Sequence, residues 1–239
     1  MGNTRPKMAG SVTDTEVAKF DALAATWWDR RGPMRALLAM NPLRTGWIAE
    51  RLPPGCRLLD VGCGGGIASE AFSRLGFAVS GIDAAPAPIA AARAHAAAGG
   101  LTVDYRATTA EALRAAGERF DAVCALEVIE HTPDPAAFVR LLAGLLNPGG
   151  KLFVSTINRT WRSYAVAIVG AERVARLLPV GTHDWRKFVT PAELAGYARS
   201  TGLVPGEVTG MVPDLARGGW RASRDFGVNY LAVSRAGAA

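Results

Sequence analysis

Short apolar runs and amphipathic stretches alternate along the middle of the chain, from about residue 57 to residue 156. The apolar runs predict strands, and apolar residues at helical spacing between them predict helices. Strands alternating with helices of this length are typical of βαβ units, so we predict a parallel sheet with both faces covered. The predicted strands are 57–61, 78–82, 102–106, 120–126 and 151–156, and the predicted helices are 67–75, 88–98, 109–116 and 135–146.

The pattern ahead of this core is helical. Residues 1–14 are polar, and we expect them to form a disordered tail rather than a signal segment. An apolar stripe at helical spacing predicts a helix over 15–29, and we interpret its Trp27–Trp28 pair as packing against the main domain. A second helix is predicted over 34–52, with Asn41–Pro42 as a candidate break.

The alternation stops after Asn158. The segment that follows suits either a lid over the active site or an interfacial element that contacts an anionic membrane, and both interpretations stay open. A helix and a final antiparallel strand pair at one sheet edge are predicted to close the chain. The segment carries Trp161, Tyr164, the apolar run 165–169, Arg159, Arg162, Arg173 and Arg176, and the closing elements are 191–201, 204–212 and 227–234.

These elements predict one domain over residues 15–239. Its expected parts are an N-terminal helical extension over 15–52, a ligand-binding core over 53–158, the lid or membrane segment over 159–190, and a C-terminal part over 191–239.

Composition and charge bear on the cellular location and the partners of the protein, but they do not indicate its chemistry. The chain is 49% hydrophobic and 20% charged, as is ordinary for a globular protein. Its net charge of +6 would suit nucleic acid, an anionic membrane surface or neither. Three cysteines without paired spacing indicate neither a disulfide framework nor a zinc site. Because no apolar run is long enough to cross a bilayer, we expect a cytoplasmic protein, with peripheral contact to the inner face of the cytoplasmic membrane left open.

The strongest chemical signal is a glycine-rich loop at the end of the first predicted strand, Asp60-Val61-Gly62-Cys63-Gly64-Gly65-Gly66. Gly62 and Gly64 let the backbone approach a ligand closely, and Asp83 ends the next strand, where an acid accepts hydrogen bonds from ribose hydroxyls. A dinucleotide would place its pyrophosphate here, and Asp60 would repel it. The same carboxylate attracts the amino group of a methionine moiety. The loop therefore favours S-adenosylmethionine, and it resembles motif I of the class I methyltransferases.

A second signal, Glu127-Val128-Ile129-Glu130-His131, follows the fourth predicted strand and so faces the methyl donor. If the chain turns helical here, Glu127, Glu130 and His131 share one face and could bind a divalent cation that leaves positions open for substrate oxygens. Alternatively, the group starts a helix in an enzyme that uses no metal. His131 is then the candidate general base.

Further motifs lie on both sides of these two signals: Lys19-Phe20, Trp27-Trp28-Asp29, Asn41-Pro42-Leu43-Arg44, Thr156-Ile157-Asn158-Arg159, Val169-Gly170-Ala171-Glu172 and Gly181-Thr182-His183-Asp184. Together with the two signals, these motifs resemble the bacterial O-methyltransferases of ubiquinone biosynthesis, over about residues 16–235.

The resemblance implies a Rossmann-like fold with a mostly parallel seven-stranded sheet and an antiparallel edge strand. It implies donor contacts from Arg44, Gly62, Asp83 and Leu126, with Arg44 suited to hold the donor's carboxylate. It also implies O-methylation of polyprenyl phenols or catechols at both O-methylation steps of the pathway, and contact with other enzymes of that pathway. A divalent cation such as Mg²⁺ at the Glu127–His131 positions is a further implication.

An RNA or protein methyltransferase is the alternative, because the chain is basic. We expect no nucleic-acid partner, since the sequence lacks the interleaved aromatic and basic residues of RNA-binding modules.

Overall fold

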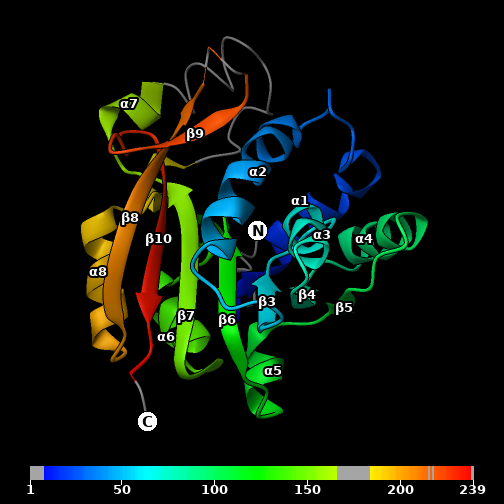
Figure 1. Ribbon diagram of the computed structural model, residues 1–239, viewed down its shortest axis with the longest axis horizontal. Coiled ribbons are helices and arrows are strands. Elements are labelled where there is room, and N and C mark those ends of the chain that lie inside the picture. Colours follow the sequence, from blue (N-terminus) through cyan, green and yellow to red (C-terminus); the bar gives the residue numbers. More distant parts are fainter. Residues whose placement is uncertain (1–7, 166–183, 215, 217, 238–239) are drawn as a thin grey trace, which may run out of the picture.

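The computed structural model describes residues 8–165, 184–214, 216 and 218–237, and they form a three-layered α/β fold (Figure 1). The main sheet has eight strands in the order β5-β4-β3-β6-β7-β10-β8-β9. The strands are β3 (Arg57–Val61), β4 (Ala78–Asp83), β5 (Asp104–Ala107), β6 (Phe120–Leu126), β7 (Leu146–Ile157), β8 (Val204–Pro213), β9 (Trp220–Ser223) and β10 (Asn229–Arg235).

Adjacent residues of a strand point to opposite faces of the sheet, and each face buries its own core. On β3, Leu58 packs with α2 and α3, whereas Leu59 packs with α5, α6 and α8. The helices are α2 (Arg35–Ala49), α3 (Ile67–Arg74), α4 (Pro86–Ala98), α5 (Ala110–Ala115), α6 (Pro135–Ala143) and α8 (Pro191–Ser200), and the short segments α7 (Trp161–Ser163) and η4 (Trp185–Lys187) lie outside these layers.

The five strands from β5 to β7 are mutually parallel, as the sequence predicts. The predicted seven-stranded sheet with an antiparallel edge strand differs in detail. β10 lies between β7 and β8, antiparallel to both, and β9 adds an eighth strand at the edge. β9 is short and lacks a run of alternating apolar residues, so the sequence pattern does not reveal it.

The N-terminal segment is more ordered at its start than predicted. Within the predicted tail, β1 (Met8–Ala9) and β2 (Val12–Thr13) pair around Gly10, and α1 (Asp14–Asp21) begins at once, because the Thr13 hydroxyl accepts a hydrogen bond from Glu16 N. The helix predicted over 15–29 stops at Asp21 and is followed by η1 (Ala24–Thr26). The candidate break at Pro42 does not occur, and α2 continues through it.

Some predictions lie outside the described residues. They concern residues 1–7, most of the apolar run 165–169, Arg173, Arg176, and the motifs over 169–172 and 181–183. In the part that is described, no helix is both long enough and apolar enough to pass through a bilayer.

The chain order of the strands reverses at β3, which lies between β4 and β6. Ligands of open α/β sheets bind at such a point, beyond the carboxyl ends of the strands. We therefore expect the ligand site at the carboxyl ends of β3, β4 and β6.

Candidate active site

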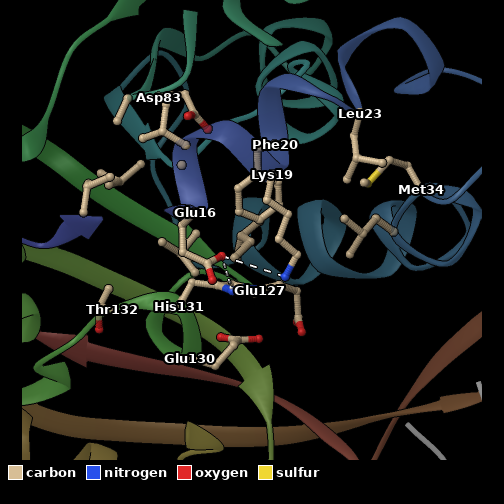
Figure 2. Close-up of a pocket in the computed structure, with 18 of the residues that line it drawn as sticks. Glu16, Lys19, Phe20, Leu23, Met34, Asp83, Glu127, Glu130, His131 and Thr132 are labelled. Atoms are coloured by element: carbon tan, nitrogen blue, oxygen red, sulfur yellow. Dashed lines mark ion pairs between the residues drawn. The ribbon is translucent and has the colours of Figure 1, made fainter. Parts of the chain in front are cut away.

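A cavity of about 770 Å³ opens at the carboxyl ends of β3, β4 and β6. Figure 2 shows that α1 lies across it, opposite the loop that follows β6. The cavity brings together the predicted donor residues Gly62, Asp83 and Leu126 with the predicted catalytic group. Its other walls are largely apolar, and they include Phe20, Leu23, Met34, Phe138 and Ile157.

The glycine loop is fixed by backbone contacts that a larger residue would break. Gly62 has φ of +70°, and a Cβ at this position would lie 2.7 Å from the Val128 side chain. Asp83 accepts hydrogen bonds from Gly64 N at 3.0 Å and Ala85 N at 2.8 Å. Burial raises the pKa of Asp83, and these two N–H groups act against the rise. The carboxylate is therefore held in place at the cavity wall, where a ribose could reach it.

Asp60 and Arg44 lie buried beside this loop rather than on the cavity wall. Asp60 accepts a hydrogen bond of 2.6 Å from Ser69 Oγ. Burial raises the pKa of Asp60 to about 6, and the Ser69 hydrogen bond and the Arg44 charge oppose the rise. Burial lowers the pKa of Arg44, against the charges of Glu127 and Asp60.

The Arg44 guanidinium is poorly satisfied. Its hydrogen bonds to Leu37 O and Asn41 Oδ1 are long, at 3.4 and 3.5 Å, and its Nε has no partner among the described residues. A buried cation with a free N–H is costly unless an anion pairs with it. The arrangement fits the carboxylate of a methionine moiety, the role that the resemblance assigns to Arg44.

The two tryptophans of the N-terminal segment clamp the glycine loop. The Trp27 ring packs on Gly64 and Gly65 so closely that neither position has room for a Cβ. Trp28 Nε1 donates to Gly65 O at 2.9 Å, and its indole stacks on His95 with ring centroids 3.6 Å apart. The predicted packing of both residues against the main domain is confirmed, and the surface they pack on is the proposed donor loop.

The predicted metal site is not assembled in this structure. Glu127 adopts a positive φ of 59°, and the helical turn η2 (Ile129–His131) starts only after it, so the expected shared helical face does not form. In the chain as described, no group of three or more His, Cys, Asp or Glu side chains is placed to hold a metal ion. A metal site formed by Glu127, Glu130 and His131 therefore stays a prediction that this arrangement does not support.

Each of the three side chains has a different partner instead. Glu127 accepts a hydrogen bond from Ser155 Oγ at 2.7 Å, and Glu130 accepts one from Thr156 Oγ1 at 2.8 Å. Burial raises the pKa of Glu130 to about 7, and the nearby Glu127 adds to the rise. His131 points its Nδ1 at Glu16 Oε2, 3.1 Å away.

The sequence analysis does not assign Glu16, Ser155 or Thr156 to the site, although Thr156 belongs to one of the motifs that carry the resemblance. Ser155 and Thr156 carried a signal, because they are polar residues at the carboxyl end of an otherwise apolar strand. Glu16 carried none, since its partner is far away in the sequence. The contact with His131 lowers the pKa of Glu16, which is consistent with a charged carboxylate at this place.

Comparisons with known proteins show the fold and the family of this chain. A family model described as a methyltransferase domain matches residues 30–207. The fold is similar to a magnesium protoporphyrin IX methyltransferase from Synechocystis PCC 6803 with bound S-adenosylmethionine, at a TM-score of 0.53, 18% identity, and coverage of 92% of this chain and 79% of that one.

Sequence relatives are much more similar. The ubiquinone biosynthesis O-methyltransferase of Methylobacterium nodulans is 51% identical over 92% of this chain and 94% of that protein. The protein of the same name from Cereibacter sphaeroides ATCC 17029 is 48% identical over 95% of this chain and 97% of that protein. The chain is a methyltransferase with a Rossmann-like fold, and it belongs to the family of ubiquinone biosynthesis O-methyltransferases.

Proposed function

We propose that this enzyme transfers the sulfonium methyl group of S-adenosylmethionine to a phenolic oxygen of a polyprenyl catechol, a precursor of ubiquinone, at both O-methylation steps of that pathway. The observation that carries the proposal is the single cavity that joins the donor loop, the His131 imidazole and an apolar wall. Donor, base and acceptor would share one cavity, as direct methyl transfer requires. The names of the close relatives support the same pathway.

The donor is proposed to lie along the ends of β3, β4 and β6. Asp83 would accept hydrogen bonds from the ribose, Gly62 would leave room for the donor, and Leu126 would contact it. At the methionine end, Arg44 would pair with the carboxylate and Asp60 would attract the amino group.

The chemistry is a direct displacement. A lone pair of the phenolic oxygen attacks the methyl carbon while the carbon–sulfur bond breaks, and the donor leaves as S-adenosylhomocysteine. A phenol has a pKa near 10 with Tyr as a proxy, so the acceptor is mostly neutral near pH 7 and must lose its proton. His131 is the proposed base, because its imidazole lines the same cavity as the donor residues. Holding the oxygen behind the methyl group supplies much of the remaining rate enhancement.

A divalent cation such as Mg²⁺ does not fit the described arrangement of Glu127, Glu130 and His131. Glu127 and Glu130 are already hydrogen-bonded to Ser155 and Thr156. We therefore assign proton removal to His131 alone.

The aromatic group Trp161, Tyr164 and Trp185 is proposed to meet the membrane that holds the polyprenyl substrate. Trp161 is 78% exposed and stacks on Trp185, with ring centroids 5.8 Å apart. The exposed Trp161 ring, with the partly buried Tyr164 and Trp185 beside it, suits the headgroup region of a bilayer. We also propose contact with other enzymes of the pathway, as the family resemblance implies.

Methyl transfer from labelled S-adenosylmethionine to a short-chain prenyl catechol tests the function. We expect O-methylated product, and we expect turnover to survive EDTA, because His131 removes the proton. Loss of turnover in EDTA with recovery in Mg²⁺ would overturn the metal-free mechanism and keep the function. No product in either condition, with donor binding intact, would overturn the catechol assignment and favour the RNA or protein substrate instead.

Substitution Asp60→Asn should raise the stability of the unliganded protein and weaken its binding of the donor. Because the pKa of Asp60 is higher in the folded than in the unfolded protein, the free energy of unfolding of the wild type falls as pH rises from about 4 to about 6. The asparagine side chain does not titrate, so the variant has no such loss. Relative to wild type, the free energy of unfolding of the unliganded variant should therefore rise by on the order of 2 to 3 kcal/mol across this pH range, measured by urea unfolding at several pH values. Its donor affinity, measured by calorimetry at pH 7, should fall about 10-fold. Unchanged donor affinity would show that Asp60 does not contact the amino group.

Substitution Trp161→Ala should weaken binding to vesicles of phosphatidylcholine and phosphatidylglycerol about 10-fold in a flotation assay, since a large apolar side chain no longer enters the interface. Leu75→Ala is the matched control, because Leu75 is 51% exposed but precedes β4 at the other end of the sheet. Equal vesicle binding by both variants and wild type would remove the aromatic group from the membrane contact.

A further inference from the structure

We propose that Glu16 is a positioning residue for His131: it holds the imidazole by Nδ1 and so leaves Nε2 free to take the proton of the phenol. This inference rests on the proposed function and deepens it. Glu16 lies on α1, and His131 ends the η2 turn after β6. Figure 2 shows the two side chains meeting across the cavity.

The contact is close and sheltered. Glu16 Oε2 lies 3.1 Å from His131 Nδ1 as an ion pair, and each side chain is only 20% exposed. This buried oxygen accepts no hydrogen bond within the described residues, so the ion pair with His131 is its close polar contact. A carboxylate on one imidazole nitrogen fixes the ring and favours a proton on that nitrogen, which leaves the other nitrogen as the acceptor. Carboxylate–imidazole pairs in hydrolases work in this way.

The ring is also held from a second side by the same helix. Phe20, one helical turn after Glu16, meets the His131 ring edge to face, with centroids 5.5 Å apart and planes at 84°. His131 N donates to Val128 O at 2.9 Å, which fixes the backbone beneath the ring. Two residues of α1 and the η2 turn therefore hold the His131 ring in place.

The other charged groups around His131 do not take the place of Glu16. Glu127 and Glu130 accept hydrogen bonds from Ser155 and Thr156. Lys19 Nζ lies 4.0 Å from Glu16 Oε2 and helps to keep that carboxylate charged. The carboxylate that faces Nδ1 is thus that of Glu16.

A consequence is that the base is completed by the N-terminal segment rather than by the sheet. The same segment carries Trp27 and Trp28 on the donor loop. If α1 were not docked on the sheet core, His131 would still be present, but Glu16 would no longer orient its imidazole.

The test compares Glu16→Gln, His131→Asn and the double variant in the prenyl catechol assay, with donor affinity measured in parallel. Glu16→Gln keeps the size of the side chain and removes its charge. We expect kcat to fall about 10- to 100-fold while donor Kd changes less than about twofold. In the His131→Asn background, the same substitution should have no further effect on kcat, because the residue it positions is gone. Asp14→Asn removes an acidic side chain from the same helix at an exposed position and should leave kcat unchanged.

A substrate-independent readout separates this inference from the proposed function. The ¹⁵N spectrum of the imidazoles, with His131 assigned by its absence in His131→Asn, should show the Nδ1–H tautomer in wild type and a shift toward Nε2–H in Glu16→Gln. Wild type that shows this tautomer and shift but does not methylate the catechol would contradict the proposed function and leave the positioning role standing.

Three results would overturn the positioning role itself: an unchanged His131 tautomer in Glu16→Gln, an equal loss of kcat from Glu16→Gln with and without His131, or a fall in donor affinity that matches the fall in kcat. The last result would mean that Glu16 only holds the helix in place.

Discussion

The site depends on the packing of the Trp27 ring against the bare backbone of Gly64 and Gly65. Only glycine leaves room for the ring, so the residues that give the loop its shape also give the N-terminal segment its docking surface. Trp28 strengthens the contact through Gly65 O, and at the far end Ser11 N donates to Glu111 at 2.7 Å. Between these two anchors α1 lies across the cavity, and Glu16 reaches His131.

The second constraint is electrostatic. Arg44, Asp60 and Glu130 are buried polar side chains whose charged forms burial disfavours, and each lies next to the cavity or the loop. Such groups cost stability, and a protein tolerates that cost mainly where function needs it. The unpartnered Arg44 Nε is the clearest sign, since the proposed donor carboxylate would satisfy it.

The core of the fold was predictable because its strands are buried on both faces. β3 and β6 have the bounds that the sequence predicts, and α3 begins at the predicted Ile67. The predictions that fail depend on local backbone geometry or on contacts between distant segments. The backbone of Glu127 has a positive φ rather than helical angles, so the shared helical face expected from the spacing does not form. The contact between Glu16 and His131 joins two elements that lie before and after the glycine loop in the sequence. Neither feature has a signature in hydrophobic periodicity.

Hydrogen exchange of a Gly65→Ala variant tests most directly whether the N-terminal segment completes the site. Gly65 does not have a positive φ, so alanine is compatible with the backbone, but its Cβ would collide with the Trp27 ring. We expect faster exchange of the backbone amides of α1, unchanged exchange in β3 and β6, and loss of methyl transfer. Faster exchange in α1 with methyl transfer at the wild-type rate would show instead that catalysis does not need the docked N-terminal segment.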